Sequence, residues 1–365
     1  MTAGESLGDK EENGSMRNQV KLAEGILVGC GNPLLDIETN ITKEFLEKWN
    51  LKENDAILCD DQHAPMFTEL IENFDVKYVP GGSTQNTLRV CQWILNEANR
   101  TVFFGSIAND EYGETLRKKA LEAGVHVRYQ TNQANDIKTG TCAALIYNHQ
   151  RSLCAHLSAA NTFTVDHLCL KENESFIEGA QYFYIAGFFL TVCPPAIMKI
   201  AKHAAEHNKV FMMNLAAPFI PKFFSEPLQE ALPYVDVVFG NEGEAKAFAE
   251  ANRFENAQDI KEIAYRIATS SDKKNVNRLR TVIITQGSDP TIVVSGDSIC
   301  EYPVKKLNNE EIVDTNGAGD AFAGGFISQF IQGKSIEDAV HCGHYAAMSI
   351  IKQHGCTIPV NCDYH

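Results

Sequence analysis

The residue types best suited to chemistry in this chain occur in residues 314–326, DTNGAGDAFAGGF. Gly317 and Gly319 allow a tight turn with exposed backbone amides, and the small, apolar residues after them predict a helix. The positive end of such a helix attracts phosphate. Asp320 falls in the first helical turn, where a carboxylate is favoured and is expected to stay ionised. It could accept a proton from an attacking hydroxyl while the amides of Gly317, Ala318 and Gly319 stabilise the phosphate oxygens. The alternative is a helix cap after a plain turn.

Two earlier runs also place polar side chains beside glycines. Gly81 and Gly82 precede Ser83 and Asn86, and paired glycines let backbone amides approach a ligand closely. Asn86 supplies both a donor and an acceptor for hydroxyl groups. Asp36 ends the run GCGNPLLD, and its carboxylate could accept hydrogen bonds from two adjacent hydroxyls. The other interpretations are a tight turn before a helix and a turn-capping aspartate.

The elements that must position these residues alternate along the chain. Short β-rich runs are separated by helix-like stretches, which predicts an α/β fold: a doubly wound, mostly parallel sheet flanked by helices. The β-rich runs are Ile26–Gly29, Thr101–Ser106, Tyr182–Gly187, Val210–Leu215, Val235–Gly240 and Thr281–Gly287, and helical spacing is clearest in Pro195–His207, in Glu242–Ala251 and after Gly319. Ligands of such sheets bind beyond the carboxyl ends of the strands.

Two segments depart from this alternation. Residues 36–61 and 126–157 show polar alternation, and Thr141–Tyr147 followed by Ser152–Leu157 predicts a β-hairpin. We expect them to form a small β-rich lid domain, which would exclude water from a reaction. We therefore expect a disordered leader over residues 1–21, one large α/β domain with this lid over residues 22–360, and a tail over residues 361–365. Residues 273–280 are expected to form a solvated basic loop.

Composition excludes several classes of function. The net charge of −15 disfavours nucleic acid and anionic membranes as partners. Anionic ligands would have to bind through backbone amides, a metal ion or a few basic side chains. The 11 cysteines are scattered without paired Cys-x-x-Cys spacing, which predicts reduced core thiols of a cytosolic protein. No Gly-x-x-x-x-Gly-Lys-Ser/Thr run occurs, so a phosphate-loop kinase is disfavoured.

The run at residues 314–326 matches the signature of the ribokinase-like carbohydrate kinases, and the chain resembles this family over residues 22–359. The run GCGNPLLD, the GGSTQN version of the glycine pair and AGFFLTV at residues 186–192 are most similar to the adenosine kinases of that family. The resemblance implies ATP-dependent phosphorylation of the adenosine 5′-hydroxyl to give AMP and ADP, a step of purine salvage. It also implies that Asp320 is the catalytic base.

The same resemblance implies which residues hold the nucleoside. They are Asn32, Leu34, Asp36, Gly81, Gly82, Ser83, Asn86, Cys142, Leu153, Ala155 and Phe188, with Leu58 also near the base. Phe188 would stack on adenine, although an aromatic residue beside a strand is more often part of the core. Ala56 stands where we would expect a glutamine near the adenine, so the finer base contacts are left open.

Further residues would hold ATP and its metal ion. Arg151 matches a lid arginine that reaches the phosphates, with a solvated turn arginine as the alternative. Asn241 and Glu244 match a motif that orders water around Mg²⁺, with a helix cap as the alternative. Thr285, Gly287, Asn316 and His344 fall where the family holds the phosphates and adenine of ATP, although a helical histidine is usually packed or exposed.

The sequence defines the acceptor substrate, the oligomeric state and the cellular location less closely. Inosine, guanosine or ribose could replace adenosine, or the protein could be a non-catalytic nucleoside-binding relative. A K⁺ requirement is left open. We expect a monomer that acts on small molecules, located in the cytoplasm, with the nucleus as a further location.

Overall fold

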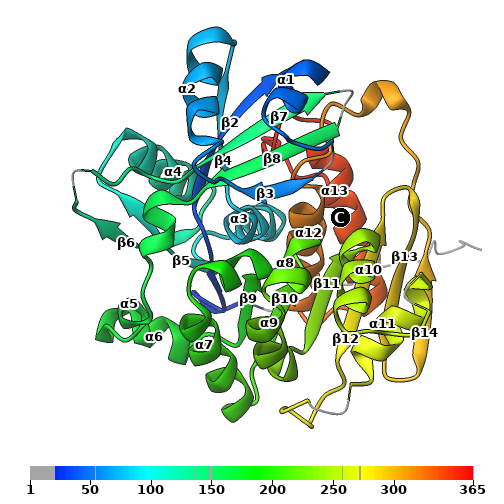
Figure 1. The fold of residues 1–365 in the computed structure, drawn as a ribbon. Coiled ribbons are helices and arrows are strands. Elements are labelled where there is room, and N and C mark those ends of the chain that lie inside the picture. Colours follow the sequence, from blue (N-terminus) through cyan, green and yellow to red (C-terminus); the bar gives the residue numbers. More distant parts are fainter. Residues whose placement is uncertain are drawn as a thin grey trace, which may run out of the picture.

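The computed structural model describes residues 21–53, 55–134, 136–147, 150–256, 258–270 and 273–364. Within these residues the chain forms a large α/β body, and a small second sheet stands over one end of it (Figure 1). The expected leader lies outside the described residues, except for Lys21, and so do the hairpin residues Asn148 and His149.

The large sheet has the order β14-β13-β12-β11-β10-β9-β1-β5-β6 among the described residues. The strands from β12 to β6 are parallel, and β13 and β14 extend the sheet in antiparallel pairing. The bounds are β1 (Leu27–Cys30), β5 (Thr101–Ala108), β6 (His126–Asn132), β9 (Tyr182–Ala186), β10 (Val210–Asn214), β11 (Val237–Asn241), β12 (Thr281–Gln286), β13 (Asp289–Ser295) and β14 (Ser298–Tyr302). The prediction of a mostly parallel sheet is confirmed, and each of the six β-rich runs forms one of its strands.

Helices cover both faces of this sheet. Neighbouring residues of a strand point to opposite faces, so Leu27 and Phe103 pack in one core while Val28 and Phe104 pack in the other. The first core is covered by α3 (Ser83–Leu95), α4 (Glu111–Glu122), α12 (Ala318–Phe330) and α13 (Ile336–Ile350). The second is covered by α5 (Val165–Leu168), α6 (Lys171–Gly179), α7 (Pro194–Glu206), α8 (Phe219–Phe223), α9 (Ser225–Ala231), α10 (Glu242–Ala251) and α11 (Ile260–Ala268). Burial on both faces explains why these strands are apolar throughout.

The small sheet has the order β3-β8-β7-β2-β4 among the described residues. Its strands are β2 (Leu34–Asn40), β3 (Ala56–Leu58), β4 (Lys77–Gly81), β7 (Thr141–Tyr147) and β8 (Gln150–His156). One face packs through residues such as Leu145 on the helices α1 (Lys43–Lys48) and α2 (Ala64–Asn73). The opposite face carries Leu34, Cys142 and Leu153, which cluster with each other on the side away from those helices.

The small sheet follows the two segments expected for a lid only in part, since β3, β7, β8 and most of β2 come from them. The segment 126–157 is divided, because β6 pairs in parallel with β5 at the edge of the large sheet. β4, which lies outside both segments, pairs with β2 in the small sheet. β6 is an edge strand, and edge strands often carry polar residues. Its polar alternation therefore resembles that of a strand in a half-exposed sheet.

The expectation that residues 273–280 form a solvated basic loop is wrong for two of its members. Lys273 Nζ lies 2.6 Å from an Asp236 carboxylate oxygen. Arg280 is 1% exposed and donates to the backbone carbonyls of Leu232, Val235 and Ile267. A guanidinium has five donors, so one side chain can hydrogen-bond three carbonyls at once.

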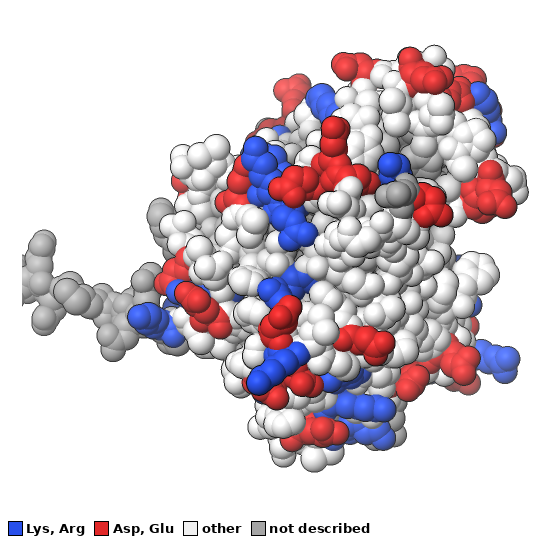
Figure 2. All heavy atoms as spheres, turned by 90° about the vertical axis from the view of Figure 1, so that its left-hand side faces the viewer, with Lys and Arg blue, Asp and Glu red and all other residues white. Residues whose placement is uncertain are grey.

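All eleven cysteines lie among the described residues and are free thiols, most of them buried. None of the described helices is long and apolar enough to cross a bilayer. Figure 2 shows the side of the molecule that carries α4 and β6, where basic and acidic side chains occur in mixed groups between uncharged surface. The net charge of −15 is therefore not gathered into one acidic patch on this side.

Candidate active site

A cavity of about 760 Å³ lies between the carboxyl ends of the parallel strands and the small sheet. It has the position expected for a ligand site of an α/β sheet. Most of the residues selected from the sequence line it, namely Asn32, Leu34, Asp36, Gly82, Ser83, Asn86, Cys142, Arg151, Leu153, Ala155, Phe188, Asn241, Glu244, Thr285, Gly287, Asn316, Gly317, Ala318, Gly319 and Asp320. Gly81 and His344 are not part of its wall.

The glycine turn lies at the floor of this cavity. Gly317 has φ 74° and is the N-cap of α12, which begins at Ala318. A side chain at Gly317 would be strained in this left-handed conformation. A Cβ at Gly319 would meet no atom within 4 Å, so this side of the turn is open. The first amides of a helix lack partners within the helix, and they can therefore bind an anion.

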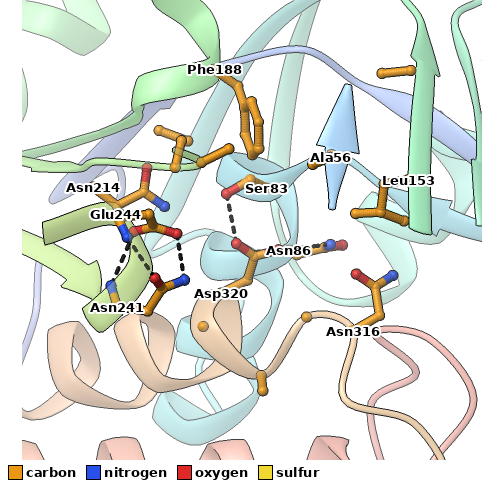
Figure 3. A pocket seen from close by; sticks show the side chains of 18 of the residues that line it. Ala56, Ser83, Asn86, Leu153, Phe188, Asn214, Asn241, Glu244, Asn316 and Asp320 are labelled. Carbon is orange, nitrogen blue, oxygen red and sulfur yellow. Dashed lines mark hydrogen bonds between the residues drawn. The ribbon is translucent and has the colours of Figure 1, made fainter. Parts of the chain in front are cut away.

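Asp320 lies in the first turn of α12 and joins it to α3. Ser83 Oγ donates to Asp320 Oδ1 at 2.6 Å, and Asn86 Nδ2 donates to Oδ2 at 3.1 Å (Figure 3). Burial raises the pKa of Asp320 from 3.8 to about 6, and the two hydrogen bonds oppose this shift. The ionised form that the sequence predicts therefore still prevails near neutral pH. Such a carboxylate can accept a proton.

The second glycine pair fixes the start of α3. Gly82 has φ 90°, and a Cβ there would lie 2.3 Å from the carbonyl oxygen of Asn32. Only glycine fits this close crossing of two backbone segments. The crossing brings the N-terminus of α3, with Ser83 and Asn86, against the N-terminus of α12. Gly81 leaves room for the Asp36 carboxylate, because a Cβ there would lie 2.2 Å from Asp36 Oδ1.

Asp36 is a buried carboxyl group in β2. Burial raises its pKa from 3.8 to about 7, and Arg151 opposes this shift. Among the described residues no hydrogen bond to the Asp36 carboxylate occurs, whereas Asn32 Nδ2 donates to the Phe188 carbonyl at 3.4 Å. A buried carboxylate without donors is costly, so Asp36 is suited to accept hydrogen bonds from a ligand.

The walls above Asp36 are apolar. Phe188 belongs to a 3-10 helix, η2 (Gly187–Thr191), and its ring centroid lies 6.0 Å from that of Phe219. Figure 3 shows Phe188 facing the cavity, with Ala56 and Leu153 on another side of it. Ala56 pairs with Leu153 across β3 and β8. A flat, apolar ring system would fit between such walls.

Arg151 lines the cavity but is not a free side chain. Its Nε and Nη2 bind the carboxylate of Asp314, and Nη2 also lies 3.0 Å from Glu38 Oε2. Nη1 is buried without a hydrogen bond among the described residues. The side chain is 4% exposed, so the alternative of a solvated turn arginine is wrong. The contact of Arg151 with phosphate stays a prediction, and Nη1 is the group that would donate to the phosphate.

Asn241 and Glu244 bind each other at the start of α10. Asn241 Oδ1 accepts a hydrogen bond from the backbone amide of Glu244 at 2.8 Å, and Glu244 Oε2 accepts one from the backbone amide of Asn241 at 3.1 Å. This is a capping box, so the alternative interpretation as a helix cap holds in the structure. Burial raises the pKa of Glu244 to about 7. Both residues still line the cavity, and among the described residues no cluster of three potential metal ligands occurs.

The remaining predicted ATP contacts divide into two groups. Thr285, Gly287 and Asn316 lie on the cavity wall. His344 does not, because it is 8% exposed, its Nε2 hydrogen-bonds the Thr291 hydroxyl at 2.8 Å and its ring packs on Phe322. Burial lowers the pKa of His344 to about 4. His344 is therefore not part of this cavity wall, and its contact with ATP stays a prediction.

Sequence reasoning missed several residues of the site. Asn214 ends β10, lines the cavity and accepts from the Gly187 amide at 2.9 Å. Its place at the end of a β-rich run could have identified it. Phe219 and Glu38 had no comparable signal, because their contacts join segments far apart in the chain.

Comparison with known proteins agrees with this geometry. The pfkB family of carbohydrate kinases matches residues 43–362. Adenosine kinase 1 of Arabidopsis thaliana is 46% identical over 342 residues, which cover 94% of this chain and 98% of the relative. The adenosine kinase of Saccharomyces cerevisiae is 45% identical, with coverage of 91% and 96%.

Solved structures give the same result. The adenosine kinase of Anopheles gambiae, in complex with P1,P4-di(adenosine-5) tetraphosphate, has a TM-score of 0.89 and 47% identity and covers 92% of this chain and 98% of its own. The Schistosoma mansoni adenosine kinase with 2-fluoroadenosine has a TM-score of 0.89 and 34% identity, with coverage of 93% and 98%. The chain therefore belongs to the pfkB family of carbohydrate kinases, within the group that contains the adenosine kinases.

Proposed function

We propose that this protein transfers the γ-phosphate of ATP to the 5′-hydroxyl of adenosine and releases AMP and ADP. The observation that carries the proposal is the position of Asp320, beside the open glycine turn of α12 and in one cavity with Asp36 and Phe188. The names of the similar proteins support the choice of adenosine as acceptor.

The small sheet and the strand ends would bind the nucleoside together. The Asp36 carboxylate would accept hydrogen bonds from the ribose hydroxyls, which supply the donors that it lacks among the described residues. The base would lie between Phe188 and the apolar wall at Leu153, where stacking and burial of apolar surface stabilise it. Asn86 already donates to Asp320, so it would orient the catalytic carboxylate as well as contact the sugar.

Asp320 would accept the proton of the 5′-hydroxyl as its oxygen attacks the γ-phosphate. The amides of Gly317, Ala318 and Gly319 would stabilise the charge on the phosphate oxygens, because the N-terminus of α12 carries the positive end of the helix dipole. Arg151 Nη1 would add a charged donor from the small sheet. Enclosure between the two sheets would exclude water, which is the competing acceptor.

The residues present fit a hydrated magnesium ion better than a directly bound one. Asn241 and Glu244 satisfy each other, and the buried Glu244 carboxylate and the exposed Asn241 amide group can still accept hydrogen bonds from metal-bound water. Magnesium bound with ATP would supply neutralising charge at the phosphates. Asn241 and Glu244 would order its water molecules without coordinating it.

A coupled assay that detects ADP tests the function. Adenosine, inosine, guanosine and ribose are offered with ATP, with and without magnesium and with and without K⁺. We expect adenosine to have the highest kcat/KM and turnover to require magnesium. A higher kcat/KM for ribose or inosine would contradict the proposed acceptor, and adenosine binding without ADP release would indicate a non-catalytic protein.

Three further expectations stay predictions: a monomer, a cytoplasmic or also nuclear location, and a part in purine salvage. Size-exclusion chromatography with light scattering tests the first, and imaging of a fluorescent fusion tests the second. Loss of labelled adenosine incorporation in cells without the protein tests the third.

A further inference from the structure

Four ionisable side chains form a continuous series from the small sheet to the glycine turn. Glu38 Oε1 lies 3.0 Å from His354 Nδ1, and Glu38 Oε2 lies 3.0 Å from Arg151 Nη2. Arg151 in turn binds the carboxylate of Asp314. The side chains of Glu38, Arg151 and Asp314 are 2%, 4% and 0% exposed, so the ion pairs are shielded from solvent, whereas that of His354 is 48% exposed.

The register of the small sheet explains why Glu38 meets Arg151. Asp36 and Glu38 are two residues apart in β2 and therefore lie on the same face, the one turned toward the cavity. Glu38 is paired with Ala144 of β7, and Arg151 of β8 is paired with Ile146 of β7. The arginine reaches Glu38 diagonally across β7, and the small side chain of Ala144 leaves room for it.

The other end of the series belongs to the large body. Asp314 Oδ1 accepts from the amide of Asn316 at 2.9 Å, and Oδ2 accepts from the amide of Gly355. A Cβ at Gly355 would lie 3.3 Å from Glu38 Oε2, so the backbone after α13 passes close to the same carboxylate. The contact of Arg151 with Asp314 thus connects the small sheet to the loop that carries the glycine turn, and the contact of Glu38 with His354 connects it to the segment after α13.

We propose that Glu38 is a positioning residue, which holds the Arg151 guanidinium at the glycine turn so that Nη1 can meet the transferred phosphate. This inference rests on the proposed function. Asp314 hydrogen-bonds the Nε and Nη2 edge and fixes the plane of the guanidinium. Glu38 Oε2 has no hydrogen bond among the described residues, but it forms an ion pair with Nη2 at 3.0 Å and adds attraction from a second direction. Nη1 is the donor left over, buried and without a hydrogen bond among the described residues. His354 Nδ1 contacts the other carboxylate oxygen of Glu38, Oε1.

Glu38→Gln tests this role, because glutamine keeps the shape of the side chain and removes its charge. We expect kcat/KM for ATP to fall about tenfold, since an arginine with one carboxylate partner is less well oriented, while the calorimetric Kd for adenosine changes less than about twofold. His354→Gln should have a smaller effect in the same direction. Glu69→Gln is the matched control, because Glu69 forms an ion pair with Lys48 between α1 and α2, on the side of the small sheet away from the cavity.

A folded Glu38→Gln variant with unchanged or improved kcat/KM for ATP would overturn the inference. Parallel losses in ATP kinetics, adenosine affinity and Tm would also overturn it, because they would indicate a purely structural ion pair. If Glu38→Gln does not fold, His354→Gln, which changes a half-exposed side chain, decides the question by the same readouts.

Failure of the proposed function would give a different result from failure of the inference about Glu38. The wild-type protein would then not phosphorylate adenosine at all, whereas failure of the present inference leaves the wild type active and the variants unaffected. If the acceptor panel identifies another substrate, the ATP kinetics of the same variants are measured with that substrate.

Discussion

Asp320 and Asp36 are two carboxyl groups of one cavity with different surroundings. Burial raises the pKa of both, to about 6 for Asp320 and to about 7 for Asp36. Asp320 receives hydrogen bonds from Ser83 and Asn86, which favour its ionised form, whereas Asp36 receives none among the described residues. Asp320 is therefore the better base at neutral pH, and Asp36 is the better acceptor for hydroxyl donors of a ligand.

The pKa of Asp320 predicts the pH dependence of turnover. Because the base must be ionised, kcat/KM for ATP at saturating adenosine should fall as the pH drops below about 6. Ser83→Ala removes a hydrogen bond that favours the ionised form, so the pKa of Asp320 should rise and the acid limb should move upward by about 0.5–1 pH unit. Saturation with adenosine keeps titration of Asp36 out of the measurement. An acid limb at the same pH in both proteins would mean that Asp320 does not determine it.

At the scale of the elements, the site depends on where strands end and helices begin. Gly82 lets the backbone cross Asn32 before α3, and Gly317 turns it before α12, so two helix N-termini converge on Asp320. Gly81 lies behind the Asp36 carboxylate and leaves room for it. Each of these glycines meets a different steric requirement.

Gly81→Ala should weaken adenosine binding selectively. A Cβ at this position would lie 2.2 Å from Asp36 Oδ1, so the carboxylate must move away from its place in the cavity. We expect the calorimetric Kd for adenosine to rise at least about tenfold, because two hydrogen bonds to a charged acceptor are lost or distorted. Gly179→Ala is the control, since a Cβ there meets nothing within 4 Å. An unchanged Kd in a folded Gly81→Ala protein would show that Asp36 is not a main contact of the ribose.

Most of the large sheet could be predicted from the sequence because its strands are buried on both faces. The apolar runs at β1, β5, β9, β10, β11 and β12 therefore stood out against the helices between them. β6 and β14 are edge strands with polar or exposed residues, so their place in the sheet was missed. β4 joins the small sheet by pairing with β2, and such long-range pairing leaves no local pattern.

At the scale of the whole molecule, the predictable part of the site is the part with local signatures. Asp320 and the glycine turn, Asp36 and the start of α3 each follow from a short run of residues. The partners of Arg151 do not, because Glu38 meets it only through strand pairing within the small sheet, and Asp314 meets it only when that sheet packs on the large body. The burial of His344 also depends on tertiary packing, here against Phe322 and Thr291.

Arg280 shows the same dependence on the complete fold. Its guanidinium donates to three backbone carbonyls near the amino end of β12, at the opposite end of that strand from the cavity. Arg280→Met should lower the free energy of unfolding by about 3 kcal/mol, because buried carbonyls lose a charged donor. Urea unfolding measures this change, with the exposed Lys274→Met as control. Unchanged stability, or loss of kcat in a fully folded variant, would contradict this structural role.

The account depends most on Asp320 as the base that activates the adenosine 5′-hydroxyl. The direct measurement compares the wild type with Asp320→Asn, using kcat from ADP release and the calorimetric Kd for adenosine. We expect kcat to fall by about three orders of magnitude or more, because asparagine cannot accept the proton, and the Kd to stay within about threefold. A variant with near-normal kcat would contradict the central claim.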